Sequence, residues 1–370
     1  MHKAENVPRT LAKHELPQLV LWLKSKFPKS LPVYHLIKNA LREDWAWPGM
    51  DVMVDTFPRP AICICRTSPF KGKLVNVPML NGHYIFVYAN NQPSFLNLLR
   101  KNFDKLANWS ETATFIDVDE DLGQILLDHN QQFARVTFGD NFGTGGNCFY
   151  FDLALWTDRR DTFPIPNHFR VGHLSVEHLD QIVANCAAGD AKAKKAFFTQ
   201  LLTKGFPTAA IFDTNHAQSS APVVYCMYMP QGSISAVYLH PDYREQGLFK
   251  MVTAELINTL YNIGEVSVWM ESVNVNFPTQ LEDLHSLGGR DYERHRKCWI
   301  QYVPKISKKV IPEKTLPQKA QIGESPVPED DTLSDMESDE EDFYAERGSS
   351  KKYGHSISER QRQAAKSHWY

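Results

Sequence analysis

The feature that most constrains the fold is the way in which strand-like and helix-like segments interleave in the second half of the chain. Between residues 169 and 303, hydrophobic periodicity, turn residues and helix caps predict the order β, α, α, β, β, β, α, β, α, β. Such interleaving is typical of an α/β structure with helices on the faces of a sheet. The predicted strands are 169–174, 208–212, 222–229, 233–239, 266–271 and 298–303, and the predicted helices are 175–186, 191–202, 248–260 and 279–287.

The first half also mixes the two kinds of segment, but it contains no recognisable catalytic motif. Its predicted helices are 10–27, 94–106 and 125–136, and its predicted strands are 33–37, 61–65 and 84–88. A chain of 370 residues favours two domains, because single cores stop growing at about 250–300 residues. We therefore expect an α/β (α+β) domain over 1–165, a linker near 163–166 and a second domain over 167–305. One interpretation of the first domain is a degenerate copy of the second.

Charged residues are segregated at the C-terminal end. Residues 320–346 hold eleven acidic side chains and no Lys or Arg, whereas residues 347–370 hold six basic side chains and one acidic one. Such a run buries too little apolar area to offset chain entropy, so we expect a disordered tail over 306–370, with a basic partner as one use of its acidic part. The rest of the chain is nearly neutral, which argues against a nucleic-acid binder.

Cysteine and glycine spacing exclude several classes of site. The six cysteines match no zinc-binding pattern, so we expect no metal, and free thiols in a reducing compartment. The glycine-rich residues 139–147 lack the spacing and the Lys of a phosphate-binding P-loop, and we interpret them as an ordinary loop. No apolar run approaches the ~20 residues needed to span a membrane.

The most informative stretch is 236–250, with the sequence AVYLHPDYREQGLFK. It joins a predicted strand to a predicted helix through an Arg-x-x-Gly turn. The first amides of a helix have no internal partner and lie at the positive end of its dipole. Gly247 lets the backbone approach an anion closely, while Arg244 and Lys250 add positive charge. This pattern predicts a site for a pyrophosphate group.

The pattern strand–Pro-x-Tyr-Arg-x-x-Gly–helix resembles the coenzyme A loop of the GNAT acyltransferase superfamily, and the order of elements around it is similar to that fold. The resemblance implies that the loop amides hold the CoA pyrophosphate and that the main chain of the preceding strand pairs with the pantetheine arm. Phe249 departs from the many members that have a small residue at that position. The implied CoA-binding residues are Val237, Tyr238, Leu239, Arg244, Gln246, Gly247, Leu248, Phe249 and Lys250.

A narrower resemblance is to glycine N-acyltransferases. It rests on the order and spacing of segments 27–34, 204–208, 241–248 and 274–276, and it covers roughly residues 15–300. It implies transfer of an acyl group from acyl-CoA to glycine, giving N-acylglycine and CoA. The implied partners are acyl-CoA and glycine or another small amine. The implied compartment is the mitochondrion, with the cytoplasm as the alternative.

The catalytic base is where the sequence departs from that family. An amine must lose a proton to be acylated, and a base contributes typically ~10²–10⁴-fold to the rate. In glycine N-acyltransferases the base is thought to be a Glu directly after the glycine of a hairpin turn. Here Ser233 follows Gly232, and a serine hydroxyl cannot serve unaided. Our catalytic candidates are Ser233 and Glu271, with His240 and His285 as further ones.

Three alternatives stay open at this point. In the first, the acceptor is an amine other than glycine. In the second, which Ser233 favours, the chain binds acyl-CoA without transferring the acyl group. In the third, which the acidic tail favours, the acceptor is a protein terminus or a lysine.

Overall fold

The computed structural model describes residues 8–42, 45, 50–67, 82–130, 134–138, 147–157, 163–186, 189–215, 220–272 and 278–304. All of them lie in one structural unit. The predicted disordered tail over 306–370 and nearly all of the predicted loop 139–147 lie outside the described residues.

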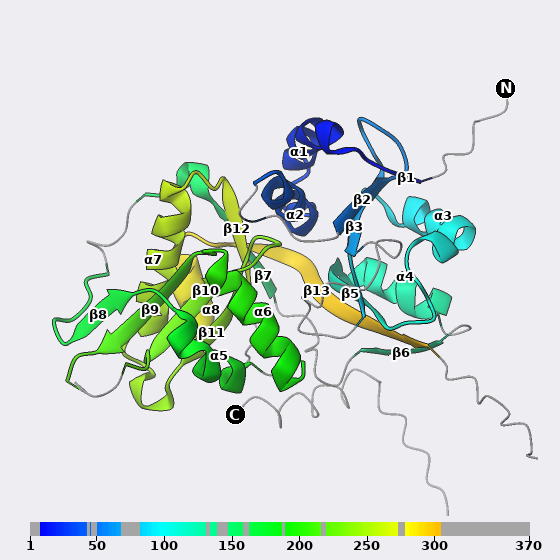
Figure 1. Cartoon of the computed structure of the whole chain (residues 1–370). Coiled ribbons are helices and arrows are strands. Elements are labelled where there is room, and N and C mark those ends of the chain that lie inside the picture. Colours follow the sequence, from blue (N-terminus) through cyan, green and yellow to red (C-terminus); the bar gives the residue numbers. More distant parts are fainter. Residues whose placement is uncertain are drawn as a thin grey trace, which may run out of the picture. The chain divides into compact units, whose positions relative to one another are not determined.

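Helices and strands alternate in the first half of the chain (Figure 1). Helices α1, α2 and α3 each have a proline in their first turn, where its missing N–H has no intrahelical partner to lose. The strands are β1 (Arg9–Thr10), β2 (Met50–Val54), β3 (Ile62–Thr67), β4 (His83–Ala89), β5 (Ala113–Asp119), β6 (Ala134–Phe138) and β7 (Asn147–Asp152), and the helices are α1 (Leu16–Lys24), α2 (Leu31–Leu41), α3 (Gln92–Asn102) and α4 (Glu120–Asn130).

The second half follows the order that the sequence predicts. Its strands are β8 (Phe169–Gly172), β9 (Thr208–Asp213), β10 (Val224–Tyr228), β11 (Ser233–Leu239), β12 (Ser267–Ser272) and β13 (Arg290–Pro304), and its helices are α5 (Leu179–Asn185), α6 (Ala191–Thr203), α7 (Leu248–Asn262) and α8 (Pro278–Ser286). The strands of both halves join in one path, β1-β2-β3-β4-β5-β13-β7-β12-β11-β10-β9-β8, with β6 paired to β13 beside it.

The same order of elements occurs twice along the chain. Leaving short 3₁₀ turns aside, β1–α1–α2–β2–β3–β4–α3–β5–α4–β6 is matched by β8–α5–α6–β9–β10–β11–α7–β12–α8–β13. In each series the fourth and fifth strands pair in parallel, β4 with β5 and β11 with β12. The other described pairings are antiparallel.

Two strands cross between the halves. Strand β7 comes from the first half, yet it pairs with β12 and with the start of β13. The end of β13 in turn lies between β5 and β6 of the first half (Figure 1). The division at residues 165–167 therefore stays a prediction, because the hydrogen-bonded sheet is continuous across it.

The core lies on both faces of the sheet. In the first half, Ile85 and Val87 pack with α3 and α4, whereas Tyr84 and Phe86 pack with α1 and α2, as the alternation of a strand requires. In the second half a single large cluster joins β9–β12 to α5, α6, α7 and α8. No helix in the described part of the chain is long and apolar enough to cross a membrane.

Two predictions for the first half are wrong. Residues 33–37, predicted as a strand, belong to α2; all of them are buried, so the run shows no polar face that would reveal a helical period. Residues 125–136, predicted as one helix, contain the end of α4 and the start of β6. Strands β1, β2, β5, β6 and β7 are absent from the prediction. Helix α3 begins at Gln92, two residues before the predicted start, and its N-cap is Asn91, whose side chain accepts a hydrogen bond from the backbone N–H of Ser94.

Candidate functional site

Strand β11 pairs with β10 along its length, whereas its described pairing with β12 involves only Ser233 and Ile234. For residues 235 to 239 no pairing on the β12 side is described, and we call this stretch the open edge of β11. Its side chains are half-buried. The predicted pantetheine-binding residues Val237, Tyr238 and Leu239 lie along this edge.

A β-bulge interrupts β11 in the same stretch. Tyr225 lies opposite Tyr238 and Met227 opposite Ser235, which leaves two β11 residues opposite one residue of β10. The first of the two, Ala236, has φ 48, a left-handed conformation uncommon for a residue with a side chain. Bulges bend a strand and increase its twist, and this one lies where the described pairing of β11 with β12 ends.

The turn after β11 ends at an uncapped helix. Gly247 is the N-cap of α7, with φ 71, and no side chain caps the helix there. Glu245 in the same turn has φ 66. The leading amides of this 15-residue helix, from Leu248 to Lys250, therefore have no side-chain cap, and they lie at the positive end of the helix dipole. These are the features of the predicted anion site, whose binding of an anion stays a prediction.

The side chains at this turn contribute unequally. The Lys250 ammonium lies 3.2 Å from Asp283 on α8 and 5.0 Å from the centre of the Phe163 ring, so only its backbone N–H belongs to the anion site. Leu248 and Phe249 are buried in the core. Burial raises the pKa of Tyr238, and the nearby charge of Arg244 opposes that shift. The Gln246 amide makes only a long contact, 3.5 Å, with a carbonyl of the same turn.

The corresponding place in the first half is closed. Strand β4 pairs with β3 without a bulge, and α3 follows it after two asparagines. The side chain of Asn91 accepts a hydrogen bond of 2.9 Å from the N–H of Ser94 and so occupies the start of that helix. Of these two equivalent positions, the one after β11 is the one left open to an anion.

The catalytic candidates are placed separately. Ser233 is buried, and its hydroxyl lies 2.9 Å from that of Ser235, a second neutral group. His240 caps the turn before the anion site through a 3.3 Å contact with the N–H of Asp242. His285 packs edge-on against Phe149. Glu271 pairs through its backbone with Cys148 on β7, and its side chain lies outside the described residues.

Helix α2 of the first half covers the hairpin that precedes Ser233. The Asn39 amide donates a 2.8 Å hydrogen bond to the carbonyl of Pro230. A Cβ on Gly232, whose φ is 84, would lie 2.1 Å from the ring of His35. The position that holds a base in the family resembled is thus sealed beneath α2.

A buried ionic cluster fixes α2 in that place. Burial and the charges of Lys38 and Arg42 hold the pKa of His35 well below its usual value, so the ring is neutral. Its Nδ1 shares a hydrogen bond of 3.0 Å with the Tyr228 hydroxyl. The Glu265 carboxylate, which is fully buried, forms ion pairs with Lys38 at 2.7 Å and Arg42 at 2.8 Å. The cluster therefore joins the two halves through ion pairs.

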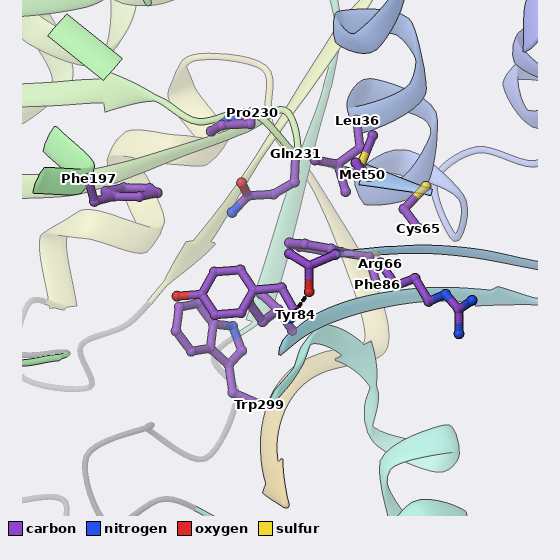
Figure 2. Close-up of a pocket in the computed structure, with 12 residues that line it drawn as sticks. Leu36, Met50, Cys65, Arg66, Tyr84, Phe86, Phe197, Pro230, Gln231 and Trp299 are labelled. Atoms are coloured by element: carbon purple, nitrogen blue, oxygen red, sulfur yellow. Dashed lines mark hydrogen bonds between the residues drawn. The ribbon is translucent and has the colours of Figure 1, made fainter. Parts of the chain in front are cut away.

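A small cavity, of about 40 Å³, lies beside the same hairpin (Figure 2). Its wall is mostly apolar and comes from both halves. Figure 2 shows the Gln231 side chain extending from the hairpin toward Tyr84 and Trp299. The lining residues are Leu36, Met50, Cys65, Arg66, Thr67, Tyr84, Phe86, Ile116, Phe197, Pro230, Gln231 and Trp299. The cavity thus lies by the first residues of β11, and the anion site lies beyond its last.

Among the residues that the structure describes, no group of three or more His, Cys, Asp or Glu side chains is placed to hold a metal ion.

Comparison with known proteins gives structural neighbours only. No family model matches the chain, and no curated protein matches its sequence. The X-ray structure of a Drosophila protein, 13% identical, covers 81% of this chain and 99% of its own, with a TM-score of 0.59. A tandem GNAT protein of the clavulanic acid pathway is 12% identical, with 81% and 99% covered and a TM-score of 0.45. A GCN5-related N-acetyltransferase from Sphaerobacter thermophilus is 11% identical, with 80% and 94% covered and a TM-score of 0.44.

The α/β (α+β) fold class predicted from the sequence is confirmed by the order and pairing of the elements. Proteins of the GNAT type are among the structural neighbours. At identities of 11–13%, the likeness to these structures concerns the fold alone. The narrower resemblance to glycine N-acyltransferases finds no support in the comparisons and stays a prediction.

Proposed function

We propose that this protein transfers an acyl group from acyl-CoA to the amine of glycine, releasing N-acylglycine and CoA. One observation carries the proposal: the open edge of β11 is followed, after one turn of the chain, by the uncapped start of α7. An extended ligand that carries amides along one part and a diphosphate at its end matches both features. The pantetheine diphosphate of CoA has that form.

The proposal also implies a direction for CoA along the strand. With its pyrophosphate on the amides of 248–250, the pantetheine arm runs back along β11 toward Ser235. The open edge is five residues long, or ~16 Å at the usual strand rise of about 3.3 Å per residue. The thioester would then lie near the hairpin end of β11, next to the cavity beside Gln231. The reacting groups meet where both halves of the chain contribute side chains.

The first experiment measures release of the CoA thiol. Purified protein receives acetyl-CoA, benzoyl-CoA or a longer acyl-CoA, with and without glycine, and with a panel of other small amines. Glycine-dependent release is the expected result. Release that depends on another amine and not on glycine would replace the acceptor and keep the reaction class.

A pair of glycine variants tests the anion site. Gly247 and Gly264 both have positive φ, near opposite ends of α7, and neither has a neighbour closer than 3.9 Å to an added Cβ. Both substitutions to Asp therefore bring similar backbone strain, but only Gly247→Asp places a negative charge at the anion site. We expect it to weaken CoA binding by roughly tenfold, equal to about 1.4 kcal/mol. Gly264→Asp should leave the dissociation constant within about twofold, as strain alone does not touch the site.

The second candidate function is acyl-CoA binding without transfer. The observation that favours it is Ser233, a neutral and buried residue where a carboxylate base is expected. Tight acyl-CoA binding with no thiol release for glycine or any amine of the panel would establish it. A Ser233→Glu variant that gains glycine-dependent activity absent from the wild type would do the same.

A further inference from the structure

Strand β5 contains a bulge at the border with the second half. Val118 lies opposite Cys298 of β13, and Phe115 lies opposite Ile300, so Ile116 and Asp117 together face the single residue Trp299. Asp117 has φ 53, in the left-handed region. Non-glycine residues in that conformation are uncommon, and they gather at functional sites.

The bulge turns Asp117 toward the second half. In a regular strand residue 117 would share the face of Phe115, which packs with α3 and α4. Instead Phe115 and Val118 both occupy that face, and Asp117 is released to the other one. There its Oδ1 accepts a 2.7 Å hydrogen bond from the indole N–H of Trp299.

The carboxyl is buried and half-satisfied. Asp117 is 3% exposed, and its Oδ2 has no hydrogen-bond partner among the described residues. Burial raises its pKa to about 6, while the Trp299 hydrogen bond, the charge of Lys297 and the approach of the Gln231 amide oppose the rise. Lys297 is itself bound to Asp119, at 2.6 Å. A carboxyl in this state is ionised near neutral pH and still takes up a proton readily.

Asp117 is connected to the cavity by the hairpin through its neighbours. The residue before it, Ile116, and both of the side chains named as its neighbours, Trp299 and Gln231, line that cavity. The hairpin end of β11, toward which the proposed function delivers the thioester, begins two residues after Gln231. Ser233, only two residues beyond Gln231, offers no carboxylate there.

We propose that Asp117, supplied by the first half of the chain, is the base that accepts the proton of the acceptor amine, in place of the carboxylate that Ser233 lacks. This rests on the proposed transferase function. The uncharged amine nitrogen attacks the thioester carbonyl carbon. As the C–N bond forms, one amine proton passes to Asp117, directly or through one water. The C–S bond then breaks, and the sulfur leaves with that proton as the CoA thiol, so the carboxylate is restored.

Three isosteric or near-isosteric variants compare the rival bases. Asp117→Asn keeps an acceptor for the Trp299 N–H, and Asn tolerates the left-handed conformation well. Beside it stand Ser233→Ala and Glu271→Gln. Amine-dependent thiol release is measured from pH 5 to 8.5 at a fixed concentration of uncharged amine, and acyl-CoA binding is measured separately. We expect Asp117→Asn to lower the rate by roughly 10²-fold or more and leave binding within about twofold.

The pH profile separates a base from a structural residue. The wild-type rate should rise with pH through an apparent pKa near 6, and this rising limb of the pH–rate profile should be missing in Asp117→Asn. Trp299→Phe removes a hydrogen bond that lowers the Asp117 pKa, so the rising limb of that variant should shift to higher pH.

Three results would overturn the assignment. They are a rate for Asp117→Asn within about threefold of wild type, a limb that disappears in Glu271→Gln or Ser233→Ala instead, and a limb that Trp299→Phe leaves in place. Absence of turnover by the wild type with every amine is a different outcome: it refutes the transferase function itself, and the role of Asp117 with it.

Discussion

Replacing Asp117 with Asn should make the protein more stable at neutral pH while it removes activity. The carboxylate is buried and accepts one strong hydrogen bond, from Trp299, so most of its desolvation is uncompensated. A residue kept for structure behaves in the opposite way, because its loss destabilises the fold. The sign of the stability change therefore tests the reasoning independently of catalysis.

The magnitude follows from the pKa. Burial moves the Asp117 pKa from 3.8 to about 6 in the folded state. Each pKa unit is worth about 1.4 kcal/mol, so ionised Asp117 costs up to about 3 kcal/mol of folding stability above pH 7. The pKa of Asp117 is higher in the folded state than in the unfolded state. Its contribution to folding stability is therefore fully present below about pH 4, and it is lost as the pH rises through about 6. The neutral amide of Asn removes this dependence.

The assay is chemical denaturation of wild type and Asp117→Asn at intervals between pH 4 and 8. The variant should be more stable by about 1–3 kcal/mol at pH 7.5, and the difference should shrink toward zero near pH 4. An Asp117→Asn protein that is less stable at every pH would refute the argument and show that the carboxylate anchors Trp299. The difference between the two proteins is the relevant quantity, since all other titrating groups are shared.

Three further substitutions test the contact between the halves and the anion site. Gly232→Ala should cost about 2–4 kcal/mol in denaturation, because the new Cβ meets His35 at 2.1 Å in a left-handed turn; a loss below 1 kcal/mol would mean that α2 moves aside easily. Glu265→Gln should cost about 2–3 kcal/mol, since it leaves the partly exposed Lys38 without its buried counter-charge; a neutral result would show that solvent reaches that charge. Lys250→Ala should change CoA affinity less than about threefold, equal to about 0.65 kcal/mol, because the Lys250 ammonium is paired with Asp283. A tenfold loss of affinity would show that this side chain contacts the phosphates.

The second half could be predicted well from the sequence because its signals are local. The hairpin glycine, the caps and the periodic helix 248–260 each specify their own segment, and each is present in the structure. Gly247, predicted to start the helix at the proposed anion site, is its N-cap in the structure. The sequence also assigned positive charge to Lys250, but the carboxylate that removes it, Asp283, lies on α8 and is distant in sequence.

The first half was harder because tertiary contacts decide its elements. Residues 33–37 are all buried, His35 included, so no exposed polar face distinguishes helix from strand. Asp117 gives no sequence signal either. Its proposed role depends on a bulge opposite Trp299 and on a hairpin more than a hundred residues away, and neither is visible in the local pattern.

Strands β7 and β13 each pair with strands of the other half, and this gives the proposed base in one half a fixed position relative to the substrate site proposed in the other. Strand β13 is hydrogen-bonded to β7 at its start and to β5 at its end, and β7 is bonded to β12. Asp117 is therefore connected to the open edge of β11 through a few adjacent strands of a sheet, not through a linker. A sheet holds its register far more precisely than a domain contact does, because a slip of one residue would turn every side chain over. In the first half the Asn91 cap occupies the corresponding helix start, and this half contributes instead the helix that covers the hairpin and the bulge that carries Asp117.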